Sequence, residues 1–97
     1  MKFISREILD RKVEMGEDIL IVDVRESYEY EEENIGGINI PLDEVLSRFE
    51  ELPRDKEVIF CCRSGSRSSA MTHTLERKYG LQNLYTLEGG LAVYFDV

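Results

Sequence analysis

The feature that constrains this chain most is a strand-like run that stops at a pair of cysteines. Residues 58–62 read Val-Ile-Phe-Cys-Cys, and the next five read Arg-Ser-Gly-Ser-Arg before a helical pattern begins. β-Branched and aromatic residues favour a strand, whereas small polar residues around a glycine favour a turn. The order therefore predicts a strand, a tight loop and the start of a helix.

The predicted loop suits a sulfur nucleophile at Cys62. Backbone N–H groups at a helix N-terminus point toward such a loop, and the helix macrodipole adds a partial positive charge. Both effects, together with nearby arginines, favour a thiolate over a thiol. We therefore expect Cys62 to be ionised at neutral pH and open to solvent. Gly65 is expected to supply the positive φ angle that lets the short loop close.

The helix after the loop carries its own start and stop signals. Ser66 or Ser68 is expected to cap its N-terminus, because serine hydroxyls accept hydrogen bonds from the first free N–H groups. An apolar stripe at helical spacing and a terminating glycine define the rest. The stripe consists of Ala70, Met71, Leu75 and Tyr79, and the glycine is Gly80.

The net charge and the composition of the chain disfavour nucleic acid and membranes as binding partners. The net charge is −8, from 12 basic and 20 acidic residues, which disfavours attraction to nucleic acid or anionic lipid. No apolar run approaches the ~20 residues of a membrane span, and the first residues lack the apolar core of a signal peptide. The sequence therefore predicts a cytoplasmic protein with no nucleic-acid or membrane partner.

The cysteine content disfavours a disulfide or a metal site. A bridge between the sequence neighbours Cys61 and Cys62 would be strained, and two cysteines do not supply a four-ligand metal set. We expect the protein to act without a metal or an organic cofactor.

Strand-like and helical patterns alternate along the rest of the chain. Residues 19–24 form a continuous apolar, mostly β-branched run that ends in charged residues, which is typical of a strand buried in a parallel sheet. Such alternation predicts a parallel sheet with helices on both faces, in one domain of residues 1–97. Further strands are expected at residues 3–4, 38–40 and 83–87, and helices at 6–15, 27–33, 42–52 and 91–95.

Four sequence blocks, in this order, resemble a single-domain rhodanese, a sulfurtransferase. They are Ile-Val-Asp-Val-Arg-Glu at 21–26, Gly-Ile-Asn-Ile-Pro at 37–41, Cys-Arg-Ser-Gly-Ser-Arg-Ser at 62–68 and Leu-Glu-Gly-Gly at 87–90. The resemblance covers nearly the whole chain. It implies an α/β fold, a three-layer α/β/α sandwich with a five-stranded parallel sheet.

The resemblance also implies a reaction. Cys62 would take a sulfane sulfur from a small anionic donor, thiosulfate or polysulfide, and carry it as a persulfide. The acceptor would be cyanide or a thiol, including a thiol on a sulfur-relay protein. The loop residues expected to bind the donor and the persulfide are Arg63, Ser64, Gly65, Ser66 and Arg67, and the supporting residues are Asp23, Arg25 and Ser68. The amides of residues 63–67 would surround the persulfide, and the two arginines would attract the donor.

The sequence departs from the family pattern in two blocks. The family motif Gly-His-Ile-Pro-Gly-Ala is replaced by the shorter Glu-Asn-Ile-Gly-Gly at 33–37, without the histidine. Tyr94 stands where the family has tryptophan after the double glycine. We expect the first change to alter one wall of the pocket and the second to affect packing.

Several polar residues are better explained by structure than by chemistry. Asp23 and Arg25 are expected to form an ion pair or a loop brace, with a similar role for Glu29. Cys61 is expected to pack in the core, with a resolving thiol as its secondary interpretation. His73 lies too far along the helix to pair with Cys62 and is expected at the surface.

Three alternatives remain open at this point. From Cys61 to Arg67 the spacing is Cys-x5-Arg, as in tyrosine phosphatases and some arsenate reductases, although their glycine would fall where Ser64 stands. A rhodanese-like module could serve only in binding, yet such modules typically lack the cysteine. An inert core cysteine at position 62 would leave the glycine, serines and arginines around it unexplained.

Overall fold

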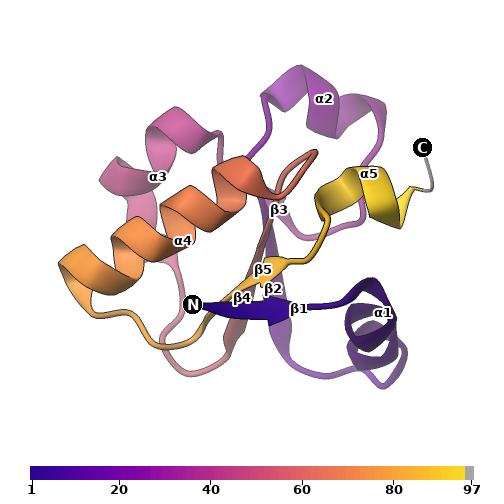
Figure 1. Cartoon of the computed structure of the whole chain (residues 1–97), viewed down its shortest axis with the longest axis horizontal. Helices are drawn as coiled ribbons and strands as arrows, with labels where there is room; N and C mark the ends of the chain where they lie inside the picture. Colours follow the sequence, from indigo (N-terminus) through magenta and orange to yellow (C-terminus); the bar gives the residue numbers. More distant parts are fainter. Residues whose placement is uncertain (96–97) are drawn as a thin grey trace.

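The centre of the fold is one sheet in which every pair of neighbouring strands is parallel (Figure 1). The structure, a computed structural model, describes residues 1–95, so the last two residues of the predicted domain lie outside the described part. Within that part the five strands lie in the order β1-β5-β4-β2-β3. Their bounds are β1 (Lys2–Ile4), β2 (Ile19–Asp23), β3 (Ile38–Asn39), β4 (Glu57–Cys61) and β5 (Leu84–Leu87).

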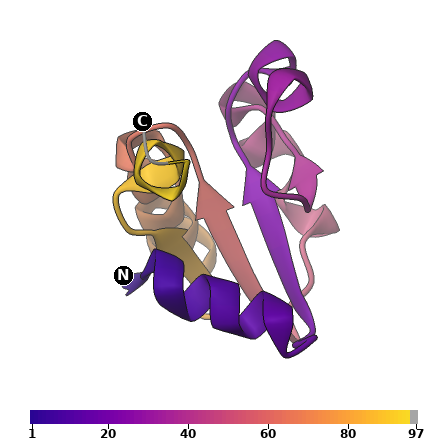
Figure 2. The ribbon, with the colours of Figure 1, turned by 90° about the vertical axis from the view of Figure 1, so that its right-hand side faces the viewer.

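Helices follow the strands and cover both faces of the sheet, which confirms the predicted α/β/α architecture. Leu9 and Leu91 pack on one face, whereas Val45 and Leu75 pack on the other. Figure 2 shows β2 and β4 pointing toward the end of the molecule at which α2 lies. The helices are α1 (Arg6–Glu14), α2 (Ser27–Glu32), α3 (Leu42–Arg48), a 3₁₀ turn η1 (Phe49–Glu51), α4 (Ser66–Tyr79) and α5 (Gly90–Tyr94).

Cys61 ends the central strand and Cys62 follows it, and the two side chains face opposite sides of the sheet. Successive side chains of a strand alternate between faces. Accordingly, Phe60 and Cys62 belong to the apolar cluster under α3 and α4, whereas Ile59 and Cys61 belong to the cluster under α1 and α5. The register places Asp23 of β2 directly beside Cys61.

The predicted helix boundaries hold where a capping residue sets them. The Ser5 hydroxyl accepts a hydrogen bond from the Ile8 amide at 3.2 Å and starts α1. Gly16 and Gly80, each with a φ of 68°, follow the ends of α1 and α4 in the left-handed conformation that glycine adopts without strain. Within residues 1–95, no helix combines the length and the apolar character that a membrane crossing requires.

Two helical predictions were wrong in detail. The α-helix from Leu42 ends at Arg48, because the residue before Pro53 must be extended and the chain tightens into the 3₁₀ turn first. In α4 the predicted stripe is only half buried. Ala70 is exposed, and Tyr79 is 37% exposed and stacks on Phe49, with ring centroids 4.0 Å apart.

Candidate active site

The loop between β4 and α4 lies at the carboxyl ends of the central strands. It runs from Cys62 to Gly65, and α4 begins at Ser66. Gly65 has a φ of 94°, a backbone conformation that other residues rarely adopt, which confirms the predicted role of this glycine. Open parallel sheets bind ligands at this edge, so the loop occupies the position expected of a site.

The sulfur of Cys62 accepts hydrogen bonds from two backbone amides. The Gly65 N–H lies 3.1 Å from Sγ, and the Ser68 N–H lies 3.3 Å from it. The Cys62 thiol in turn contacts the Ser68 hydroxyl oxygen at 3.6 Å. Amide donors aimed at one sulfur, at the positive end of a 14-residue helix, stabilise negative charge there.

The same geometry explains why the predicted serine caps are wrong. Gly65 is the N-cap of α4, and neither Ser66 nor Ser68 caps the helix. An N-cap side chain normally accepts from the third helical N–H, which is that of Ser68 here. The Cys62 sulfur takes this place, so the helix start is used to hold the cysteine.

The expectation that Cys62 is open to solvent was wrong, since its exposed fraction is 0%. The sulfur points into the apolar cluster on the α3 and α4 side of the sheet, with the amides of the loop turned toward it. Arg63 and Ser64 of the same loop are exposed. In this structure the Cys62 side chain is therefore covered, although the loop beside it is exposed.

Cys61 is a core residue, as predicted. It is 0% exposed and packs among aliphatic side chains on the other face of the sheet. Desolvation in this cluster raises the pKa of the Cys61 thiol far above its usual value. A buried thiol that stays protonated and faces away from Cys62 is poorly placed to act as a resolving cysteine.

The double glycine after β5 supports the loop from behind, a role that sequence analysis did not assign. The Leu91 amide donates to the Cys62 carbonyl at 2.8 Å, and the Ala92 amide donates to the Arg63 carbonyl at 2.9 Å. A Cβ atom on Gly90 would lie 2.5 Å from the Arg63 carbonyl oxygen and 2.6 Å from the Gly65 nitrogen. The sequence did carry a signal for this role, because two adjacent glycines in the Leu-Glu-Gly-Gly block indicate a place where the backbone approaches another segment closely.

Asp23 and Arg25 form the predicted ion pair, and the structure buries it. Arg25 Nη2 lies 2.8 Å from Asp23 Oδ2, and Nε lies 3.0 Å from Oδ1. These hydrogen bonds raise the pKa of Arg25 above its ordinary value and keep it charged. Arg25 Nη2 also donates a hydrogen bond to the Glu33 carbonyl at 2.7 Å. The side-chain amide of Asn39 donates to the backbone carbonyls of both Asp23 and Arg25. The pair thus braces the segment after β2.

Two other polar predictions have clear outcomes. Glu29 braces its own helix, since its carboxylate accepts from the Glu26 amide at 3.1 Å at the start of α2. His73 is exposed on α4, as expected. Among residues 1–95, His, Cys, Asp and Glu side chains form no group of three that could hold a metal ion.

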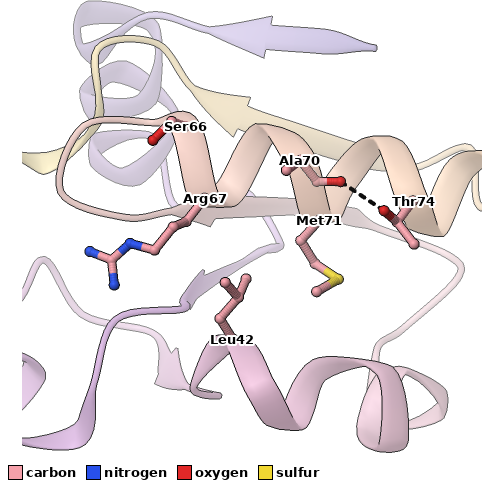
Figure 3. A pocket seen from close by; sticks show the side chains of 6 residues that line it. All are labelled: Leu42, Ser66, Arg67, Ala70, Met71 and Thr74. Carbon is pink, nitrogen blue, oxygen red and sulfur yellow. Dashed lines mark hydrogen bonds between the residues drawn. The ribbon is translucent and has the colours of Figure 1, made fainter.

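The side chains of Arg63 and Arg67 line two different cavities. Arg63 lines a cavity of about 360 Å³ with Arg25 and residues of α2. Arg67 lines a separate groove of about 300 Å³ between α3 and α4 (Figure 3). In this structure the two arginine side chains therefore line different cavities, and their joint contact with a donor stays a prediction.

Known proteins resemble this chain over most of its length. A family model described as "Rhodanese-like domain" matches residues 5–96. The Bacillus subtilis protein YtwF, provisionally named a sulfurtransferase, is 34% identical over 97% of this chain and 90% of its own length. YrkF of the same organism, provisionally named a sulfur carrier protein, is 38% identical over 91% of this chain, which spans only 48% of YrkF. A rhodanese-related protein from Thermoplasma volcanium superposes with a TM-score of 0.86 at 29% identity, covering 99% of this chain and 92% of that one.

Proposed function

This chain belongs to the rhodanese-like domain family of sulfurtransferases, and from that premise we propose that it transfers a sulfane sulfur through a persulfide on Cys62. The observation that carries the proposal is the pair of amides, from Gly65 and Ser68, that donate to the Cys62 sulfur. Such donors stabilise negative charge on a nucleophilic sulfur and on the persulfide that it forms.

In the first half-reaction the Cys62 thiolate attacks the outer sulfur of thiosulfate. A new S–S bond forms to Cys62, the bond between the two thiosulfate sulfurs breaks, and sulfite leaves with that electron pair. A polysulfide donor would react in the same way and release a chain shorter by one sulfur. Arg63 is exposed and has no ion-pair partner among residues 1–95, and we infer that it attracts the anion from the cavity that it lines together with Arg25 and three glutamates of the chain after β2.

In the second half-reaction a thiophile attacks the outer sulfur of the persulfide. Cyanide would leave as thiocyanate, and a thiolate would leave as a new persulfide, with the Cys62 thiolate restored in both cases. The sulfur-carrier name of YrkF supports a protein thiol as one such acceptor. A cytoplasmic location fits this scheme, and cell fractionation would test it.

The alternative with Cys-x5-Arg spacing has little support. Its nucleophile would be Cys61, which packs on the opposite face of the sheet from the Ser68 amide and hydroxyl that Cys62 contacts. Because burial also raises the pKa of the Cys61 thiol, a thiolate there is unfavourable. A purely binding role would leave the amide contacts to Cys62 without a use.

Turnover of thiosulfate and cyanide to thiocyanate tests the proposal. We expect Cys62→Ala to lower the rate by about 10³-fold or more, as is usual when a nucleophile is removed. Cys61→Ala is the matched control, and we expect the folded variant to retain most of the activity. Equal activity in wild type and Cys62→Ala would contradict the proposal, as would no sulfur transfer from thiosulfate or polysulfide by the wild type.

A further inference from the structure

Two buried threonines beneath α4 have no role in the reaction proposed above. Thr72 lies on α4 and Thr86 lies on β5, and both are fully buried. Their hydroxyl oxygens are 3.0 Å apart. The Thr72 hydroxyl donates its one hydrogen to the Ser68 carbonyl at 2.8 Å, so the hydrogen between the two threonines comes from Thr86.

The two threonines extend a series of hydrogen bonds that starts at the Cys62 sulfur. The Ser68 amide donates to Sγ at 3.3 Å, and the Ser68 carbonyl accepts from Thr72, which in turn accepts from Thr86. Residue 68 is thus held on both sides, because its N–H contacts the sulfur and its C=O is bound to a hydroxyl that the sheet holds. The start of α4 is therefore connected to β5 by polar contacts.

The strand that carries Thr86 lies beside the strand that leads to Cys62. Thr86 pairs with Phe60 in the register of β4 and β5. Phe60 and Cys62 belong to the apolar cluster under α3 and α4, and so does Leu84, two residues before Thr86. Residues two apart on a strand share a face. The hydroxyl pair therefore joins α4 to the sheet on the same face as the sulfur.

A pair of hydroxyls is not what stability alone favours among apolar side chains. Burial removes the hydrogen bonds of each hydroxyl to water, and replacing both members of such a pair by apolar groups of the same shape can be nearly neutral or even stabilising. Valine has the shape of threonine without the hydroxyl. The polar pair adds direction, because hydrogen bonds depend on distance and angle whereas apolar burial does not.

The contact between the Ser68 amide and the sulfur depends on such direction. A hydrogen bond weakens steeply when its donor turns away from the acceptor. The Ser68 amide belongs to the first turn of α4, so a small rotation or shift of the helix on the sheet would misalign it with Sγ. A hydroxyl pair about one helical turn further along opposes that movement.

We propose that Thr72 and Thr86 are positioning residues for sulfur transfer, and that their hydroxyl pair fixes α4 on the sheet so that the Ser68 amide stays aimed at the Cys62 sulfur. The inference rests on the proposed function and adds two residues that do not touch the reacting atoms. Their effect on the reaction is exerted through Ser68.

The test removes both hydroxyls and keeps the shape of the side chains. In the double variant Thr72→Val/Thr86→Val we expect the urea midpoint to stay close to that of wild type, since neither hydroxyl is left without its partner. The rate constant of Cys62 persulfide formation at saturating thiosulfate, measured in a single turnover, should fall about fivefold, the equivalent of one hydrogen bond of ordinary net strength. The thiosulfate concentration that gives half of that rate should not change, because the pair does not touch the donor.

Thr74→Val is the matched control on the same helix. The Thr74 hydroxyl donates to the Ala70 carbonyl at 3.0 Å (Figure 3), as Thr72 does to Ser68, four residues back in both cases. Among residues 1–95 the Thr74 hydroxyl has no hydrogen-bond partner on a strand. This variant should therefore load sulfur at the rate of wild type.

The conservative variant separates positioning from stability. Thr72→Ser keeps the hydroxyl and loses a buried methyl group, so it should be less stable than wild type and yet load sulfur at nearly the same rate. Loading at the wild-type rate by the double valine variant would overturn the inference, as would equal slowing in Thr74→Val or in Thr72→Ser. A wild type that takes no sulfur from thiosulfate or polysulfide would refute the proposed function itself.

Discussion

Cys61 and Cys62 are neighbours in sequence and equally buried, yet their surroundings differ in kind. Cys61 packs among aliphatic side chains that include Ile59, Leu87 and Leu91, and Asp23 of the neighbouring strand lies beside it in the sheet. The Cys62 sulfur is also 0% exposed but receives two amide hydrogen bonds and contacts a hydroxyl. The difference follows from strand alternation, which sends one side chain under α1 and the next to the start of α4.

The comparison shows that solvent exposure does not distinguish the reactive cysteine from the structural one. What distinguishes them is the set of polar groups directed at the sulfur. Burial among hydrocarbon favours the neutral thiol, whereas buried N–H donors favour negative charge more strongly than the same donors in water. If the two faces of the sheet are independent, a change beside Cys61 should leave the chemistry of Cys62 unaffected.

The largest expected effect on stability comes from the ion pair beside Cys61. Asp23→Asn leaves the Arg25 charge buried and only partly compensated, and we expect a loss of about 3–5 kcal/mol in the free energy of unfolding, measured with urea. Asp18→Asn, at an exposed pair with Lys56, is the control and should cost about 0.5 kcal/mol or less. The folded Asp23 variant should still load sulfur at a rate close to that of wild type. A selective loss of loading would show that the two faces are coupled.

The next effect concerns the support of the loop. Gly90→Ala places a Cβ atom against the Arg63 carbonyl at a φ of 67°, and we expect a cost of about 2–4 kcal/mol together with slower loading of Cys62. Gly80→Ala has nearly the same φ but nothing within 4 Å, so it should cost about 1 kcal/mol. Equal stability and loading rates in the two variants would contradict the close packing of Gly90 on the loop.

A smaller effect is expected from the hydroxyl that contacts Cys62. In this structure the Cys62 thiol donates to the Ser68 hydroxyl, which donates to the Gly65 carbonyl. We expect the hydroxyl to turn and donate to the sulfur once Cys62 is a thiolate. Ser68→Ala removes that donor but keeps the backbone amide, so sulfur loading should slow about tenfold, or about 1.4 kcal/mol in the barrier. Ser69→Ala is matched, because both hydroxyls donate to the Gly65 carbonyl and only Ser68 contacts the cysteine. If Ser69→Ala slowed loading as much, the effect would come from the carbonyl contact alone.

The smallest expected effect on stability comes from the ion pair between Lys12 and Glu57, the first residue of the central strand β4. Lys12 lies 2.9 Å from Glu57 and holds the pKa of Glu57 below its usual value through their hydrogen bond. The stabilisation is therefore present above the carboxyl pKa of the unfolded chain and is lost as the pH falls through the lower folded value. Glu57→Gln should cost about 0.5 kcal/mol at pH 6 and less near pH 3, after allowance for solvent screening. A larger cost at pH 3 would contradict this sign.

The structure confirms the sheet and the order of the elements that the sequence predicted, and Cys62 as the nucleophile stays a prediction. These follow from local patterns: the β-branched run at residues 19–24, the glycine at position 65 and the serine and glycine that bound α1. Helix lengths were less certain, because the residue before Pro53 changes the last turn of α3 in a way that apolar spacing does not show.

What the sequence could not show depends on residues far apart in the chain. The burial of Cys62 arises when α4 closes over β4, and the support from Gly90 requires β5 and α5 to return to the loop. The separation of Arg63 from Arg67 is also a property of packing, since the two side chains leave the loop toward different helices. Spacing in the sequence placed them together, whereas the fold separates them.

The most direct test locates the added sulfur. Full-length protein is treated with thiosulfate or polysulfide and analysed by mass spectrometry. Because Cys61 and Cys62 are adjacent and fall in the same peptide, fragment ions are needed to assign any added sulfur to one of them. The account predicts one added sulfur on Cys62, its removal by cyanide, and the same result in Cys61→Ala. Sulfur on Cys61, or none on either cysteine, would contradict the claim that the amides of the loop hold the reacting sulfur.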